Sequence, residues 1–209
     1  MFDASLAEAN PTLVAYAELL RTVGAERGLI GPREVERVWD RHILNCAVVT
    51  DPALGLVSDG ASVTDVGSGA GLPGLVWAIV RPDLQVVMVE PLLRRSTFLT
   101  EAVAELGLSD RVTVLRARAE ELAATWPGSD IVTARAVAPL AKLLGWTMPL
   151  VKPGGSLLAL KGASAADEVA AAAAELRKFE AQTPEIVLAG EGSVDPATTV
   201  VRVTKRPAR

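Results

Sequence analysis

A glycine-rich segment at residues 65–74, DVGSGAGLPG, holds the residue types that point most directly to chemistry. Glycines at positions 67, 69 and 71 permit a tight turn in which the backbone approaches a ligand closely. A loop of this kind that follows a strand and opens a helix lies at the carboxyl edge of a parallel sheet, where cofactors bind. The segment therefore predicts a cofactor site.

Two cofactors fit this loop. Gly69, Gly71 and Gly74 match the dinucleotide pattern GxGxxG, which predicts NAD(P) and an oxidoreductase. The acidic-x-GxGxG pattern that begins at Asp65 predicts S-adenosylmethionine instead, whose ammonium and sulfonium groups tolerate a nearby carboxylate. Glu90, at the end of the next expected strand, can accept hydrogen bonds from both ribose hydroxyls of either cofactor. A glycine turn that serves only strand–helix packing is the third interpretation.

The elements that position this loop follow from hydrophobic patterning. β-Branched runs alternate with helical patterns five times from residue 61 onwards, and a hairpin follows, with expected strands at residues 62–67, 84–90, 111–117, 129–136, 153–162, 186–188 and 199–203. Such alternation predicts an α/β fold with a doubly wound, mostly parallel seven-stranded sheet. Five units and a hairpin suit a class I S-adenosylmethionine-dependent methyltransferase better than two mononucleotide-binding halves.

The first sixty residues predict helices. Val38, His42 and Cys46 belong to an apolar stripe at i, i+3, i+4 spacing in the second of these helices, which Pro32 precedes. The expected organisation is therefore a small helical N-terminal extension at residues 1–60, followed by a Rossmann-like domain at residues 61–209.

Composition limits the site and the compartment. A single cysteine excludes an internal disulfide, a single histidine excludes a histidine cage, and no metal site is expected. No apolar run reaches the roughly 20 residues of a membrane span, and the segment MFDASLAEAN is no signal peptide. These features predict a cytoplasmic protein that does not contact a membrane.

Charge first argues against a nucleic-acid partner, because the formal net charge is −4. Residues 1–60 hold 5 basic and 9 acidic residues, so the remainder is neutral and carries local arginine clusters. Any affinity for RNA is therefore expected to be modest and to depend on shape.

Several segments occur together in an order and spacing that is specific to one family: RHILN (41–45), DVGSGAGLPG (65–74), IVRP (79–82), a run at 90–99 with Arg94-Arg95, ARA (134–136) and LKG (160–162). The chain resembles the bacterial 16S ribosomal RNA guanine-N7 methyltransferases, also called glucose-inhibited division protein B, over essentially its whole length. The resemblance implies methyl transfer from S-adenosylmethionine to N7 of a guanine in the decoding region of 16S rRNA. The partner would be 16S rRNA in the small ribosomal subunit or an assembly intermediate, and we expect a monomer.

The resemblance also implies roles for individual residues. Gly67 and Leu72 would line the donor site, Ala119 and Glu120 would contact the adenosine end, and Arg135 would lie at the mouth. With the acidic and glycine positions of the loop and strand ends, the expected cofactor-binding residues are Asp65, Gly67, Gly69, Gly71, Leu72, Glu90, Ala119, Glu120 and Arg135.

Two departures separate this chain from the family pattern. Asn45-Cys46 stands where most members have Asp-Ser, and ERGLIGPREV (26–35) stands where many carry a Trp-Asn…Asn-Leu-Thr segment. The second departure is expected of an actinobacterial-type member.

Residue chemistry excludes several acceptors. Methylation at carbon 5 of a pyrimidine needs a cysteine nucleophile, but the one candidate, Cys46, lies on the apolar helical stripe. Methylation at adenine N6 is not indicated either, because TARAVAPL (133–140) lacks the motif of those enzymes. Guanine N7 has a free lone pair and no proton to remove, so a site without a nucleophile or general base suits it. Methylation places positive charge on the base. We therefore expect the candidate catalytic residues Arg135 and Lys161 to hold phosphate, base O6 or the donor carboxylate, and not to act as acids.

The candidate RNA contacts are Arg41, His42, Arg94, Arg95 and Lys161. His42 also admits a second interpretation, a buried histidine that fixes the N-terminal helices to the sheet. Three alternative functions stay open on the sequence: a small-molecule methyltransferase with the same donor site, an NAD(P)-dependent oxidoreductase, and a non-catalytic ribosome-assembly factor.

Overall fold

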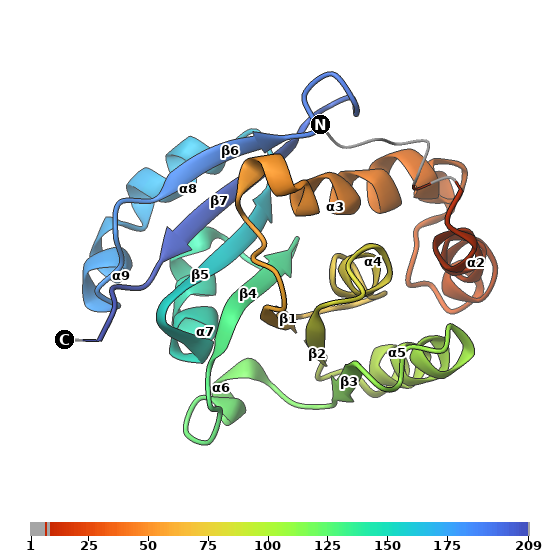
Figure 1. Ribbon diagram of the computed structural model, residues 1–209, viewed down its shortest axis with the longest axis horizontal. Helices are drawn as coiled ribbons and strands as arrows, with labels where there is room; N and C mark the ends of the chain where they lie inside the picture. Colours follow the sequence, from red (N-terminus) through yellow and green to blue (C-terminus); the bar gives the residue numbers. More distant parts are fainter. Residues whose placement is uncertain (1–6, 8, 209) are drawn as a thin grey trace.

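A seven-stranded sheet in the order β3-β2-β1-β4-β5-β7-β6 forms the centre of the computed structural model, which describes Ala7 and residues 9–208 (Figure 1). Its strands are β1 (Ser62–Val66), β2 (Gln85–Val89), β3 (Val112–Leu115), β4 (Ser129–Arg135), β5 (Val151–Lys161), β6 (Glu185–Ala189) and β7 (Thr198–Thr204). Strands β1 to β5 pair in parallel, and β7 pairs antiparallel with both β5 and β6. The expected doubly wound, mostly parallel sheet is confirmed.

The strand order reverses between β1 and β4. Asp65 of β1 is in register with Met88 of β2 on one side and with Thr133 of β4 on the other. The carboxyl ends of these three strands therefore meet at one edge. In open α/β sheets this switch point leaves a crevice in which ligands bind.

Helices cover both faces of the sheet (Figure 1). The α-helices are α2 (Pro11–Leu19), α3 (Asn45–Ala47), α4 (Gly74–Val80), α5 (Leu93–Glu105), α6 (Ala119–Leu122), α7 (Leu140–Thr147), α8 (Ala165–Ala171) and α9 (Ala173–Lys178). Alternate strand residues supply two core layers: Ile131 joins α2, α4 and α5, whereas its neighbour Val132 joins α7, α8 and α9. Burial on both faces explains the near-continuous hydrophobic strands.

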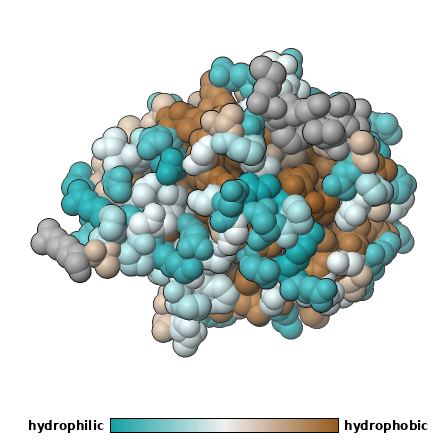
Figure 2. All heavy atoms as spheres, in the orientation of Figure 1, coloured by the Kyte–Doolittle hydropathy of each residue, from teal (hydrophilic) through white to brown (hydrophobic). Residues whose placement is uncertain are grey.

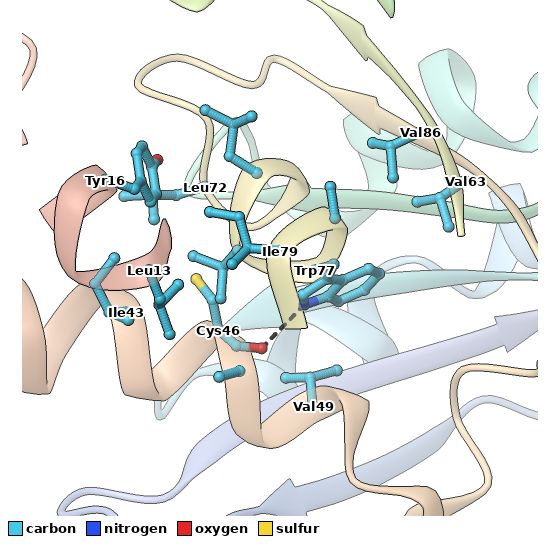
Figure 3. Packing of buried hydrophobic residues seen from close by; sticks show 14 of the residues in the cluster. Leu13, Tyr16, Ile43, Cys46, Val49, Val63, Leu72, Trp77, Ile79 and Val86 are labelled. Atoms are coloured by element: carbon cyan, nitrogen blue, oxygen red, sulfur yellow. Dashed lines mark hydrogen bonds between the residues drawn. The ribbon is translucent and has the colours of Figure 1, made fainter. Parts of the chain in front are cut away.

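The N-terminal helices share the first of these cores. Leu13 and Tyr16 of α2 and Cys46 of α3 belong to the same core cluster as Trp77 of α4, which is fully buried (Figure 3). The indole Nε1 of Trp77 donates to the backbone oxygen of Cys46 at 2.9 Å, and the Tyr16 hydroxyl donates to that of Ala70 at 2.8 Å. The helical region is thereby fixed to the glycine loop.

The second expected helix is irregular. A 3-10 segment (Pro32–Arg37), a π-helical segment, η3 (Val38–Leu44), and α3 follow one another. Within the stripe, Val38 and Cys46 are buried, whereas His42 is only partly so. His42 lies beside the sheet edge, where Arg135 ends β4.

The alanine-rich segment at residues 164–182 forms two helices, because Ala172 leaves helical geometry with φ −90° and ψ 9°. Ala172 is fully buried where α8 and α9 both contact α7, and its small side chain permits that close approach.

Within the described residues, no helix is long and apolar enough to cross a membrane. The expectation that the segment at residues 1–10 is no signal peptide falls mostly on residues 1–6 and 8, which lie outside the described part. Hydrophilic and hydrophobic residues lie side by side on the face seen in Figure 2. The exposed large apolar side chains fall on separate segments, at Val14, Leu92, Leu93, Val137, Ile186 and Leu188.

Candidate functional site

The glycine loop leaves β1 with a backbone that only glycine adopts readily. Gly67, Gly69 and Gly71 have φ angles of +69°, +58° and +101°. A Cβ atom on Gly67 would lie 2.9 Å from Cγ2 of Val137, and one on Gly71 would lie 2.6 Å from Cδ1 of Leu75. Both the conformation and the close packing therefore require glycine at these two positions.

Asp65 supports the loop from beneath. Its side chain is fully buried, and Oδ2 accepts a hydrogen bond from the Gly74 amide at 3.1 Å. The other oxygen, Oδ1, has no hydrogen-bond partner among the described residues. Burial raises the pKa of Asp65 to about 7, so the carboxyl group retains its proton close to neutral pH. Asp65 thus ties the end of β1 to the start of α4.

Glu90 connects the same loop to the end of β2. Its side chain is only 2% exposed, Oε2 accepts from the Gly69 amide at 3.0 Å, and Oε1 accepts from the Leu92 amide at 3.0 Å. A carboxylate has about four acceptor positions, so two amide bonds leave capacity for a diol. The carboxylate is held in a fixed place beside the loop.

A cavity of about 520 Å³ opens in front of these groups, and we call it the donor cavity. Its lining is Leu29, Ile30, His42, Gly67, Ser68, Gly69, Ala70, Leu72, Glu90, Pro91, Leu92, Arg95, Arg118, Arg135, Ala136 and Val137. The structure therefore brings together five of the expected cofactor-binding residues: Gly67, Gly69, Leu72, Glu90 and Arg135.

Four expected residues do not line the donor cavity. Asp65 and Gly71 lie behind the loop that lines it. Ala119 is buried and Glu120 is exposed, and both follow directly on Arg118, which does line the cavity. Sequence reasoning also missed Leu29 and Ile30, because nothing in their spacing indicates that the N-terminal region closes one side of the cavity.

A second cavity, of about 650 Å³, lies on the β5 side, and we call it the acceptor cavity. It shares Arg135, Ala136 and Val137 with the donor cavity. The rest of its lining is Arg41, Asn45, Ala138, Pro139, Leu160, Lys161, Gly162, Ala163, Glu168, Pro196, Ala197, Thr198 and Thr199. Two adjoining cavities with one common wall could hold a cofactor and a second reactant.

Arg135 belongs to that common wall and is bound to the N-terminal helices. Its Nη1 donates to Sγ of Cys46 at 3.2 Å, and its Nη2 donates to the backbone oxygen of Arg41 at 3.0 Å. The same Nη2 lies 2.8 Å from Nδ1 of His42. The guanidinium is therefore held in place by residues far from it in sequence.

Lys161 already has two acceptors, one of which is anionic. Its Nζ donates to the Ala138 oxygen at 2.6 Å and to Oε2 of Glu168 at 2.7 Å, and its side chain is 9% exposed. The lysine ammonium and two further donors lower the pKa of Glu168 against the effect of burial, which alone would raise it. Arg41 lies 3.5 Å from Glu34. Both cations line the acceptor cavity with their charges partly or fully compensated.

Arg94 and Arg95 differ from these cations. They are exposed at the start of α5, and Arg116 and Arg118 are exposed after β3. None of the four has an ion-pair partner within the part of the chain that the structure describes. We call these four residues the arginine cluster. Since β2 and β3 are parallel neighbours, the cluster lies at the same sheet edge as the donor cavity.

Comparison with known proteins identifies the family. The family model for rRNA small subunit methyltransferase G matches residues 9–194. Proteins named ribosomal RNA small subunit methyltransferase G are 57% identical in Thermobifida fusca, over 94% of this chain and 81% of the relative, and 56% identical in Streptomyces coelicolor, over 91% and 77%.

Solved structures show the same fold. A precorrin-6y C5,15-methyltransferase from Geobacter metallireducens superposes with a TM-score of 0.53 at 16% identity, over 87% of this chain and 91% of that one. A SAM-dependent O-methyltransferase from Thermotoga maritima gives 0.57 at 17% identity, over 84% and 71%. The family match confirms the expected methyltransferase and its donor, S-adenosylmethionine, and does not favour the oxidoreductase, while the solved structures confirm the fold. The chain belongs to the family of rRNA small subunit methyltransferase G.

Proposed function

We propose that the protein transfers a methyl group from S-adenosylmethionine to N7 of a guanine in the decoding region of 16S rRNA. The observation that carries this proposal is the pair of cavities with a common wall at residues 135–137, one of them built on the glycine loop and Glu90. The substrate is 16S rRNA in the small ribosomal subunit or an assembly intermediate. The protein acts as a monomer in the cytoplasm.

The donor cavity fits S-adenosylmethionine. Gly67 has no room for a Cβ atom, and Gly69 is held by Glu90, so the loop backbone can lie against the ligand. Bound there, the cofactor supplies an electrophilic methyl carbon on its sulfonium. Glu90 holds the ribose hydroxyls, Leu72 packs against the ligand, and Asp65 and Gly71 shape the loop. Ala119 and Glu120, next to Arg118 of the lining, approach the adenosine end.

The acceptor cavity suits a nucleophile that has no proton to lose. Burial and the nearby Arg135 lower the pKa of His42 to about 4, yet its Nδ1 lone pair is taken up by Arg135. The carboxylate of Glu168 is occupied by Lys161 and by the Leu140 amide. Neither group is available as a general base. Guanine N7 needs none, since its lone pair lies in the ring plane, and positioning supplies much of the acceleration.

The candidate RNA contacts lie at both cavities. Arg94 and Arg95 bind phosphate at the donor-cavity side, Arg41 and Lys161 border the acceptor cavity, and His42 lines the donor cavity beside Arg135 of the common wall. Lys161 and Arg135 hold phosphate, base O6 or the donor carboxylate, and do not act as acids. Residues 1–60 form a helical extension to the methyltransferase domain at residues 61–209, and contribute to both cavities.

Mapping of N7-methylguanine in 16S rRNA tests the proposal. Ribosomes from cells with the gene should carry a modified guanine that is absent when the gene is deleted. A plasmid copy should restore the mark, and a Gly67→Arg copy, which fills the donor cavity, should not. An unchanged N7-methylation pattern after deletion would refute the RNA target. Methyl transfer from labelled donor to small molecules would then support the alternative substrate class.

A further inference from the structure

The wall between the two cavities depends on one side chain whose position is set by a different part of the chain. Arg135 ends β4, and its guanidinium makes three contacts with residues 41–46, in η3 and α3. Guanidinium has five N–H donors. Three of them point to Cys46, the Arg41 oxygen and His42, so two are left for ligands in the cavities that Arg135 lines.

His42 is suited to orient this group. The ring is neutral, because protonation would bring two cations together. Its Nδ1 therefore offers a lone pair, 2.8 Å from Nη2 of Arg135. The proton is then on Nε2, which lies 3.2 Å from Oε2 of Glu34. The lowered pKa of His42 agrees with this tautomer. Glu34 therefore faces one side of the ring and Arg135 the other.

Cys46 supports the second branch of the guanidinium. Its thiol is fully buried, and Sγ accepts from Nη1 of Arg135 at 3.2 Å. Burial raises the pKa of Cys46, which keeps the thiol neutral and makes it an acceptor without charge. A neutral sulfur and a neutral imidazole orient Arg135 while its full positive charge is retained for the cavities.

We propose that His42 and Cys46 are positioning residues that act through Arg135, and that they fix its two remaining N–H donors toward the donor and the acceptor. The kinetic part of the test below rests on the function proposed above, because it uses methyl transfer to ribosomal subunits. The donor-binding part needs no RNA and does not depend on that function. The N-terminal helices thus help to build the methyl-donor site.

Two polar variants of His42 provide a matched test. Asn places its amide oxygen close to where Nδ1 lies, whereas Gln places it near the Nε2 position, away from Arg135. Donor affinity is measured by calorimetry with S-adenosylhomocysteine, and kcat and KM for the donor are measured with small ribosomal subunits. Each variant is also made in an Arg135→Met background, and thermal unfolding verifies that every variant is folded.

His42→Gln should weaken donor binding about tenfold in the wild-type background, within the coupling range of side chains in contact, and His42→Asn should stay within about threefold of wild type. In the Arg135→Met background, the two variants should bind the donor equally. Equal losses for Asn and Gln, or a Gln penalty that persists without Arg135, would overturn the proposal, since His42 would then act directly or only through stability.

Cys46 gives an independent arm if the His42 variants unfold. Cys46→Ser keeps an acceptor for Nη1, and Cys46→Ala removes it. The Ser variant should bind the donor more tightly than the Ala variant in the wild-type background, and the difference should vanish with Arg135→Met. An equal difference in both backgrounds contradicts the inference. Absence of N7 methylation by the wild type contradicts only the proposed function, because the calorimetric results stand without it.

Discussion

The carboxyl group of Asp65, buried beneath the glycine loop, makes the stability of the protein depend on pH. Its pKa is raised from 3.8 to about 7 because burial penalises the charged form. The folded protein therefore binds a proton that the unfolded chain releases between these values, so this group makes the free energy of unfolding fall as pH rises from about 4 to about 7.

Asp65→Asn should remove that dependence. Asn keeps an oxygen for the Gly74 amide but carries no charge, so the stability of the variant relative to wild type should increase from pH 4.5 to pH 7.5, by at most about 4 kcal/mol. Urea unfolding at the two pH values measures the difference. A relative stability that does not change with pH would show that Asp65 titrates normally.

Gly67 can be separated from other left-handed glycines by a matched control. Gly67 and Gly60 have nearly equal φ angles, +69° and +65°, but only Gly67 has a neighbour, Val137, within reach of an added Cβ. Each Ala variant should lose about 1 kcal/mol of stability from the backbone strain. Only Gly67→Ala should also weaken S-adenosylmethionine binding in calorimetry, because it displaces the wall that Val137 forms. Equal donor affinity in both variants would contradict this role.

The sequence predicts which residues stand at the strand ends, but not which side chains and backbone atoms they contact. Glu90 was expected beside the loop, where the structure has it, because its place at a strand end follows from local pattern. Lys161 was expected to face a ligand, yet its ammonium binds Ala138 and Glu168. Its role in catalysis stays a prediction, since an ion pair across strand and helix ends cannot be read from spacing.

At the scale of elements, the arginine cluster is defined by two adjacent parallel strands. The start of α5, which follows β2, presents Arg94 and Arg95, and the segment after β3 presents Arg116 and Arg118; none of the four has an ion-pair partner among the described residues. Hydrophobic patterning predicted these strands and the helix α5. Their adjacency, which brings two separate arginine pairs together, is a property of the sheet order.

Arg94→Ala tests the cluster. The substitution should raise KM for small ribosomal subunits about tenfold, as expected for the loss of one charge-assisted hydrogen bond, with donor affinity unchanged. Arg177→Ala, which removes an exposed arginine in α9 on the opposite side of the sheet, is the control and should leave KM at the wild-type value. Equal KM values for the two variants would exclude Arg94 from RNA binding.

At the scale of the whole molecule, the net charge of −4 limits how strongly RNA can be held. With the four residues of the arginine cluster as the main phosphate contacts, the logarithm of RNA affinity should fall with the logarithm of salt concentration at a slope of about −3. Filter binding across a salt series measures it. A slope near −10 would indicate an extended basic surface that this chain does not carry in its described residues.

The β/α alternation, the glycine loop, the flanking carboxylates and the family can all be predicted from the amino-acid order, because each depends on residues that are close along the chain or on motifs in fixed order. Which side chains meet depends on the folded arrangement. Arg135 is separated from His42 by 93 positions and from Cys46 by 89, and Leu29 and Ile30 reach the donor cavity from the bend between the N-terminal helices. Such contacts depend on how helices pack on the sheet edge, and no local spacing encodes that geometry.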